Sequence, residues 1–79
     1  MLTIYTADDH PVLSKGLRDI INVEYRFKLL GYSADGETAL KEILVKEPDI
    51  AILDIEMPVL NGIEVAKKLI ENQSKTNLI

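Results

Sequence analysis

The sequence contains no cysteine and no tryptophan, and only four of its 79 residues are glycine. Without cysteine, a disulfide framework and a thiolate metal site are both excluded. No apolar run approaches the roughly 18 residues that a membrane span requires. The opening segment MLTIYTADD lacks the basic flank and the small-residue cleavage site of a signal peptide. We therefore expect a soluble, cytoplasmic protein with no membrane partner.

Basic residues are also scarce. Nine lysines and arginines stand against thirteen aspartates and glutamates, which gives a net charge of -4. A nucleic-acid-binding domain usually carries a clustered basic face, so this chain is not expected to bind nucleic acid itself. The composition, 47% hydrophobic and 28% charged, is that of a globular protein, and the length allows one domain.

The hydrophobic pattern switches repeatedly between strand-like and helix-like periods. The predicted strands cover 2–7, 27–34 and 49–54, the predicted helices cover 11–24, 36–47 and 62–72, and 77–79 is predicted to begin a fourth strand. Strict alternation of strand and helix indicates an α/β fold, with a parallel sheet, right-handed crossovers and helices on both faces. Asn61 and Glu64 form a capping-box pattern at the start of the third helix.

The periodicity also predicts which helix residues face the core. These are Leu13, Leu17, Ile20 and Ile21 in the first helix, Leu40, Ile43 and Leu44 in the second, and Ile63, Ala66, Leu69 and Ile70 in the third. The segment DIAILD is almost wholly apolar, as expected for a strand that is covered on both faces.

Acidic residues follow two of the predicted strands. Asp8 and Asp9 follow the first strand, and Asp54 ends the third. If these strands are neighbours, the three carboxylates meet at one edge of the sheet, where open parallel sheets bind ligands. Like charges about 4 Å apart repel by roughly 4 kcal/mol at an effective dielectric near 20. Either one carboxylate is protonated or a divalent cation sits among them, and an all-oxygen site favours Mg²⁺ or Mn²⁺.

Two motifs carry a family resemblance. TADDHP at the end of the first strand, together with DIEMPVLNG after the third, resembles the receiver domain of two-component response regulators. The DDHPVLSKGL opening is most similar to the subgroup whose receivers precede a helix-turn-helix DNA-binding domain. The resemblance implies a flavodoxin-like open parallel sheet of strand order 2-1-3-4-5. This chain would supply βαβαβα and the start of strand 4.

The resemblance also implies roles for individual residues. Asp54 would be the phosphoacceptor, taking a phosphoryl group from a sensor histidine kinase in the presence of Mg²⁺ or Mn²⁺. Asp9 would bind the ion directly, Asp8 mainly through water, and Glu56 through its backbone carbonyl. The chain would therefore be a signalling domain rather than an enzyme, and its partner protein would be the kinase.

A complete receiver would need more residues than this chain has. By resemblance, they carry a serine or threonine at the end of strand 4 and a lysine after strand 5. Thr76 and Lys75 come too early in the sequence for either role. We therefore expect residues 1–79 to be the N-terminal two-thirds of a receiver domain. The remainder would be absent, and so would the output domain through which the full protein would bind DNA.

Three alternatives stay open. First, exposed edges of a partial sheet favour a self-associating interaction module, a homo-oligomer without phosphorylation switching. Second, Asp54-Ile55-Glu56 has a weak similarity to the Asp-x-Asp of aspartate-nucleophile phosphatases, with Glu56 in place of the second aspartate. Third, His10 could take a metal-binding or catalytic role, although a single histidine before Pro11 is more typical of a solvent-facing residue at a helix start.

Overall fold

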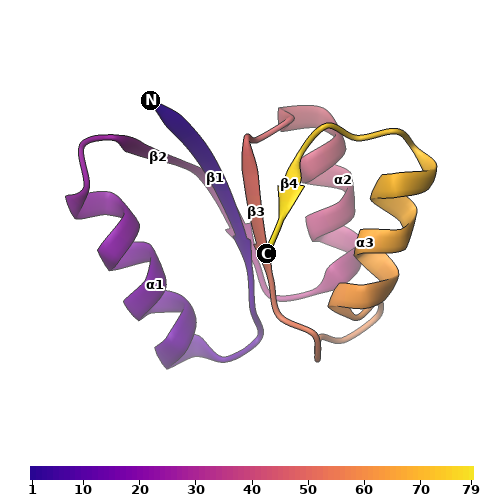
Figure 1. Cartoon of the computed structure of the whole chain (residues 1–79). Coiled ribbons are helices and arrows are strands. Elements are labelled where there is room, and N and C mark those ends of the chain that lie inside the picture. The colour runs from indigo at the N-terminus through magenta and orange to yellow at the C-terminus, as the bar shows by residue number, and fades with distance from the viewer.

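The computed structural model describes all of residues 1–79 as a four-stranded parallel sheet with three helices (Figure 1). The elements are β1 (Leu2–Ala7), α1 (Pro11–Val23), β2 (Phe27–Ser33), α2 (Gly36–Lys46), β3 (Ile50–Leu53), α3 (Gly62–Glu71) and β4 (Asn77–Leu78). The strand order is β2-β1-β3-β4, with each neighbouring pair parallel. The predicted fold and element order are confirmed. Each predicted boundary lies within one residue of the observed one.

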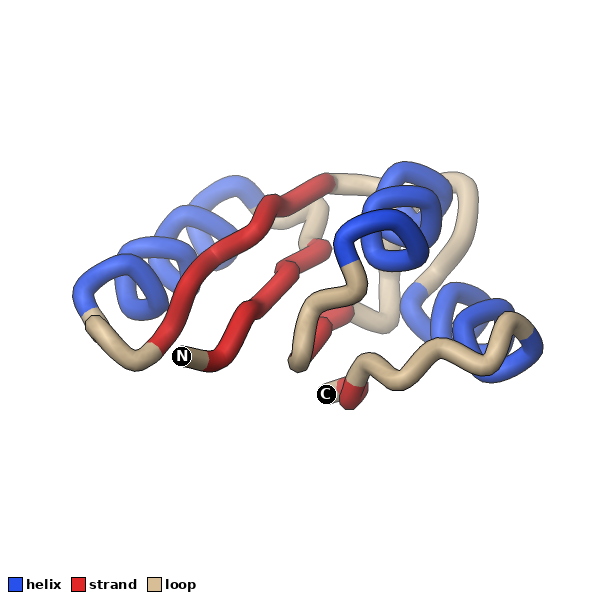
Figure 2. Tube along the Cα trace, turned by 90° about the horizontal axis from the view of Figure 1, so that it is seen from above, coloured by secondary structure: helices blue, strands red, loops and turns tan.

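Helices cover both faces of the sheet, as Figures 1 and 2 show, with α1 on one side and α2 and α3 on the other. Neighbouring residues of a strand point to opposite faces. Tyr5 and Ala7 of β1 therefore face α2 and α3, and Ile4 and Thr6 face α1. The main apolar core lies on the α2 and α3 side: it consists of Tyr5, Ala7, Ala39, Ile43, Ala51, Met57, Val65 and Leu69.

The helix α1 buries fewer of its apolar residues than its sequence pattern predicts. Leu13 and Ile20 were expected to face the core but are exposed, whereas Ile21 is buried and Leu17 is half-buried. Ser14 is buried in the same stripe. The helix α1 packs mainly on β1 and β2. Only residues spaced three to four apart, along one narrow side of the helix, therefore reach the sheet.

The other two helices bury part of the predicted face: Ile43 and Leu69 are buried, and Leu40 and Ala66 are half-buried. In α2, Leu44 is exposed and Ala39 is buried, while Ile43 is buried as expected. In α3, Val65 and Leu69 are buried, whereas Ile63 and Ile70 are exposed. Each helix contains more apolar residues than one stripe needs, so periodicity alone admits two faces. Packing between α2 and α3 selects the stripe that is buried.

Two helix starts are fixed by side-chain caps. The Asp35 carboxylate accepts hydrogen bonds from the Thr38 backbone N–H at 2.8 Å and from the Thr38 hydroxyl at 2.9 Å. The predicted capping box at α3 is confirmed. Asn61 Oδ1 accepts from the Glu64 N–H at 2.8 Å, and Glu64 Oε1 accepts from the Asn61 N–H at 3.1 Å. None of the helices is long and apolar enough to cross a membrane.

The Asp35 cap gives a pH-dependent stability prediction. The two bonds from Thr38 hold the pKa of the Asp35 carboxyl below its usual range. A lowered folded-state pKa stabilises the fold above the unfolded pKa of about 3.9, and this stabilisation is lost as pH falls through the folded value. Asp35→Ala should lower the free energy of unfolding by about 0.5 to 1 kcal/mol at neutral pH. The difference from wild type should shrink between about pH 5 and pH 3 in urea titrations.

The control is Asp19→Ala, which removes an exposed acid within α1 that pairs only with Lys15 at the helix surface. Such pairs contribute little, so its effect should stay below about 0.5 kcal/mol. Equal losses in the two variants would contradict the capping argument.

Val59 gives a second stability prediction, because it has a backbone φ of 70° in the loop between β3 and α3. This left-handed conformation is costly for a β-branched residue, by about 1 to 2 kcal/mol, and free of that cost for glycine. The side chain is 69% exposed, so little packing is lost on its removal. After the entropy cost of glycine, Val59→Gly should raise the free energy of unfolding by about 0.5 to 1 kcal/mol in urea titrations.

The matched control is the same substitution at Val45, which is 81% exposed but lies inside α2. Glycine in a helix interior is unfavourable, so Val45→Gly should destabilise the protein by about 0.5 to 1 kcal/mol. A loss of stability in both variants would show that the Val59 backbone is not strained.

Candidate metal centre

The parallel pairing of β1 with β3 brings the acidic segments together. Ala7 pairs with Leu53 at the carboxyl ends of the two strands, and the Asp54 N–H donates to the Ala7 carbonyl at 2.9 Å. On the other side, the Asp8 N–H donates to the Ser33 carbonyl at the end of β2, at 3.0 Å. These backbone bonds place Asp8 and Asp54 directly beyond the same edge of the sheet.

Four side chains converge at this edge: Asp8, Asp9, His10 and Asp54. One ligand-type atom from each lies within 4.8 Å of the corresponding atoms of the other three. Asp8 and Asp54 are half-buried and the other two residues are exposed. The three predicted acids are therefore neighbours in space, although Asp54 is far from the other two in the sequence. Their roles as metal ligands and phosphoacceptor stay predictions.

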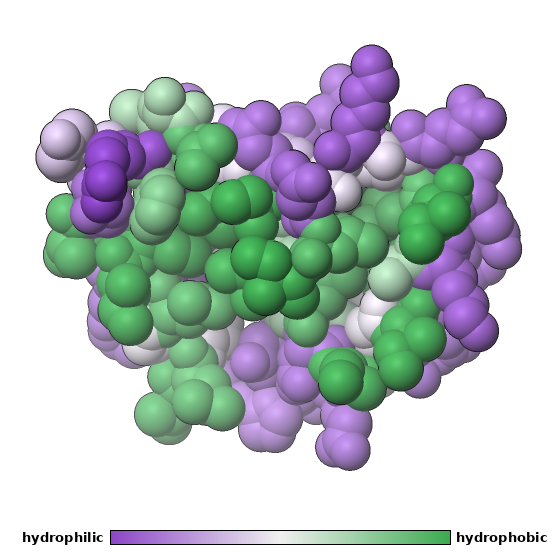
Figure 3. All heavy atoms as spheres, viewed as in Figure 1, coloured by the Kyte–Doolittle hydropathy of each residue, from purple (hydrophilic) through white to green (hydrophobic).

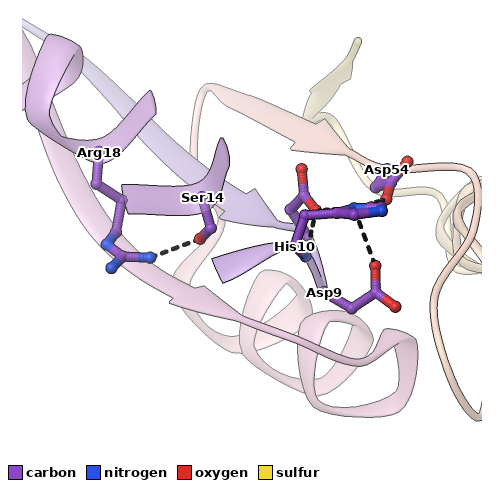
Figure 4. A network of polar contacts seen from close by, with 6 residues as sticks. Asp9, His10, Ser14, Arg18 and Asp54 are labelled. Atoms are coloured by element: carbon purple, nitrogen blue, oxygen red, sulfur yellow. Dashed lines mark hydrogen bonds and ion pairs between the residues drawn. The ribbon is translucent and has the colours of Figure 1, made fainter. Parts of the chain in front are cut away.

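His10 lies in the middle of this group (Figure 4). Its Nδ1 is 2.8 Å from Asp8 Oδ1, 3.2 Å from Asp9 Oδ1 and 3.2 Å from Asp54 Oδ2. The hydrogen bond to Asp8 is the main cause that raises the pKa of His10, and the negative charges of Asp9 and Asp54 raise it further. As expected, His10 is a solvent-exposed residue at the start of α1. The ring is 55% exposed, yet its Nδ1 edge faces the three carboxylates.

Asp54 shows why this edge suits a cation. Its Oδ2 is buried and has no hydrogen-bond donor, although the side chain as a whole is 25% exposed. A buried carboxylate oxygen without a partner is costly, and a positive charge would remove that cost. Three carboxylates around one point form a hard-oxygen donor set, which fits Mg²⁺ or Mn²⁺.

The other residues considered from the sequence lie outside the cluster. Glu56 is two positions beyond Asp54 in the same loop, with its side chain exposed, and its predicted carbonyl contact stays a prediction. Thr76 precedes β4, as expected, and its hydroxyl donates to the Pro48 carbonyl at 2.8 Å. That contact is at the amino end of the sheet, away from Asp54. Lys75 is an exposed residue beside Thr76.

A glycine holds the loop after Asp54 in place. The Gly62 N–H donates to the Ile55 carbonyl at 2.9 Å. A Cβ built on Gly62 would lie 2.1 Å from the Asp54 carbonyl oxygen, which is impossible without moving the backbone. The Asn-Gly pair therefore does two things: Asn61 caps α3, and Gly62 lets the start of α3 approach the residue that carries the buried carboxylate.

A shallow depression flanks the acids on the α1 side. Asp8 and Asp9 line it together with Ser14, Arg18 and Tyr32. Arg18 donates to the buried Ser14 hydroxyl, as Figure 4 shows, and its guanidinium lies over the Tyr32 ring, 3.8 Å from the centroid. Sequence reasoning missed this cation beside the acids. The i, i+4 spacing of Ser14 and Arg18 was the available signal, but nothing local pointed to Tyr32.

Comparison with known proteins identifies relatives along nearly the whole chain. Residues 4–79 match the family model described as "Response regulator receiver domain". The transcriptional regulatory protein YvfU of Bacillus subtilis is 35% identical over 79 residues, which is 100% of this chain and 40% of that protein. The protein-glutamate methylesterase of the same organism is 37% identical over 71 residues, which is 90% of this chain and 20% of that protein.

The solved structures that resemble this chain are receiver domains as well. The receiver domain of the response regulator NarL from Mycobacterium tuberculosis matches with a TM-score of 0.94 at 28% identity. The alignment covers 98% of this chain and 62% of that one. The response regulator domain of Thermotoga maritima CheB matches with a TM-score of 0.91 at 32% identity, over 99% of this chain and 57% of that one. This chain thus spans less than two-thirds of each of these relatives, and it belongs to the response regulator receiver domain family.

Proposed function

We propose that the chain is a phosphoacceptor module, in which Asp54 receives a phosphoryl group beside a divalent cation held by Asp8, Asp9 and Asp54. The observation that supports this most is the Oδ2 of Asp54, which is buried and accepts no hydrogen bond, at the point where three carboxylates converge. Glu56 would add its backbone carbonyl, as family resemblance implies. A Mg²⁺ or Mn²⁺ ion would supply charge neutralisation as the phosphoryl group approaches the carboxylate.

The chemistry at Asp54 is a single displacement. A carboxylate oxygen of Asp54 forms a bond to phosphorus, while the bond from phosphorus to the donor breaks and its electron pair stays with the donor. With a phosphohistidine donor, the leaving group is the imidazole nitrogen of the kinase, which then takes up a proton. The backbone bond from Asp54 N–H to Ala7 holds the nucleophile in place during this step.

The wider system is part of the same proposal. The donor protein would be a sensor histidine kinase, and this chain would receive the phosphoryl group in the cytoplasm. Among solved relatives, one is titled a DNA-binding response regulator of the LuxR family from Staphylococcus aureus, which matches with a TM-score of 0.93 at 27% identity. This supports DNA binding as the output of the complete protein through a separate domain.

The phosphatase alternative gains no support, because the Glu56 side chain is exposed and outside the carboxylate cluster.

The test is labelling of the chain with a small phosphoryl donor or its analogue. Incubation with Mg²⁺ and phosphoramidate should add one phosphoryl group, detectable by intact-mass spectrometry. Beryllofluoride should give one bound ¹⁹F NMR signal set. Asp54→Asn should abolish both signals because it removes the nucleophilic oxygen, and omission of Mg²⁺ should reduce labelling at least tenfold.

Asp19→Asn is the matched control, since Asp19 is an exposed acid on α1 whose side chain bonds only Lys15. It should be labelled as wild type. Labelling that persists in Asp54→Asn would refute the assignment of the phosphoacceptor.

A second candidate function is self-association, which an apolar groove beside the β4 edge favours. Seven of the nine residues that line this groove are apolar, and the other two are Gly62 and Lys67. The apolar residues are Leu53, Ile55, Ile63, Ala66, Ile70, Leu78 and Ile79. Figure 3 shows apolar side chains gathered across the middle of the face that carries β4 in Figure 1. Only Asn77 and Leu78 pair with β3, and β4 has no strand on its other side. We propose that a second copy of the chain covers this groove.

A charge in the groove should prevent this association. Ile70 is 70% exposed on α3, so Ile70→Lys should leave the fold intact and lower the weight-average mass at high concentration towards that of a monomer. Analytical ultracentrifugation measures this mass. Val45→Lys on α2, equally apolar and exposed, should leave it unchanged. A wild-type chain that stays monomeric at the highest concentration would exclude the candidate.

A further inference from the structure

Asn61 and Gly62 form the only Asn-Gly pair in the sequence. An asparagine side chain loses ammonia when the backbone nitrogen of the next residue attacks its amide carbon. Glycine is the most permissive next residue, because it has no Cβ to crowd that nitrogen. The other asparagines, Asn22, Asn72 and Asn77, precede valine, glutamine and leucine. In an unfolded chain, Asn61 is therefore the side-chain amide most open to this reaction.

The folded chain holds both reacting groups apart. The Gly62 N–H is buried and donates to the Ile55 carbonyl at 2.9 Å. Asn61 Oδ1 accepts from the Glu64 N–H at 2.8 Å, which fixes the asparagine side chain over the first turn of α3. The attack requires the Gly62 nitrogen to lose its proton to a base and the Asn61 side chain to turn back on its own backbone. Both hydrogen bonds must open before either event can occur.

Close packing explains why so reactive a pair occupies this position. A Cβ on Gly62 would lie 2.1 Å from the Asp54 carbonyl oxygen, so no bulkier residue fits after Asn61. Asparagine is also one of the best residues for the N-cap position that Asn61 holds. The requirements that build the loop beside Asp54 therefore place a reactive pair within it.

We propose that Asn61 is a latent modification site, which deamidates when the loop between β3 and α3 opens locally. In the open loop, the Gly62 nitrogen loses its proton and bonds to the Asn61 Cγ. The bond from Cγ to Nδ2 then breaks, and the nitrogen takes up a proton and leaves as ammonia. Water opens the resulting cyclic imide at either carbonyl, which gives aspartate or isoaspartate at position 61. The reaction consumes one water, releases one ammonia and adds one negative charge to the chain.

The two products differ in their effect on the fold. Aspartate at position 61 keeps an oxygen for the Glu64 N–H, and its charge suits the N-terminus of a helix. Isoaspartate instead lengthens the main chain by one carbon before Gly62. The structure has no room for this, because even a Cβ on Gly62 would meet the Asp54 carbonyl oxygen. Isoaspartate therefore displaces the start of α3 from Asp54 and breaks the capping box.

Incubation of the wild-type chain in mildly alkaline buffer tests the site and its protection. Peptide mass spectrometry locates the deamidation, and an isoaspartate methyltransferase measures the isoaspartate product. In urea-unfolded chain, Asn61 should react faster than the other three asparagines. In the native chain its rate should fall at least tenfold, since the opened loop is a minor state. Equal rates in the native and unfolded chains, or a faster reaction at another asparagine, would overturn the proposal.

Glu64→Ala separates local opening from unfolding of the whole chain. It removes the carboxylate that accepts from the Asn61 N–H at 3.1 Å, so native deamidation should become about three- to tenfold faster. The matched variant Val45→Gly destabilises the chain inside α2 and leaves the capping box intact. Its rate should stay within about twofold of wild type. Equal acceleration in both variants would show that the reaction needs global unfolding, which contradicts the proposal.

The stability of the products gives a second readout that needs no variant. Ion-exchange chromatography separates the deamidated chains by their added negative charge, and the methyltransferase then distinguishes the two products. The isoaspartate form should unfold at a lower urea concentration than the aspartate form, which should stay close to wild type. Equal stability of the two forms would refute the tight fit of Gly62 against Asp54 on which the proposal depends.

Discussion

The backbone hydrogen bond from Asp54 to Ala7, at 2.9 Å, is the constraint on which the site depends. It is the last backbone hydrogen bond between the paired segments of β1 and β3, whose pairing begins with Ile4 opposite Ile50. A shift of one residue would bring the larger Ile50 or Ile52 to the face where the fully buried Ala51 fits. The burial of Ala51 in the core, with the half-buried Leu53 packed against it, thus also fixes where Asp54 lies. Packing sets the register, and the register sets the distance between carboxylates.

The loop after Asp54 turns this placement into a rigid site. Gly62 lets α3 begin against the Asp54 backbone, and a Cβ on Gly36 would lie 1.8 Å from the Leu60 carbonyl oxygen, so α2 approaches the other end of the loop just as closely. Met57 is buried in the core between them. Such close contacts leave the loop few alternative paths, which explains why Val59 adopts a left-handed conformation that valine disfavours.

The strand order was implied by the resemblance to receiver domains. Sequence reasoning predicted the parallel α/β fold itself, because strand-like and helix-like apolar periods alternate along the chain. It also predicted that Asp8, Asp9 and Asp54 would be neighbours, since ends of adjacent parallel strands share an edge. It did not predict which stripe of α1 and α3 is buried, because several apolar stripes fit each helix and only packing chooses between them. The contacts of His10 with the three acids were missed for another reason. Its ring direction depends on the turn between β1 and α1, which no periodic pattern describes.

The site and the rest of the fold are linked through charge. Three carboxylates that converge repel one another, by roughly 4 kcal/mol for a pair 4 Å apart at an effective dielectric near 20. A protein of this size has a total stability of only about 5 to 10 kcal/mol, so this repulsion is a large fraction of it. In the structure, the His10 ring lies where a counter-charge is needed. A dication in the centre would then replace one source of positive charge by another. Binding to the folded state alone would also stabilise the pairing of β1 with β3.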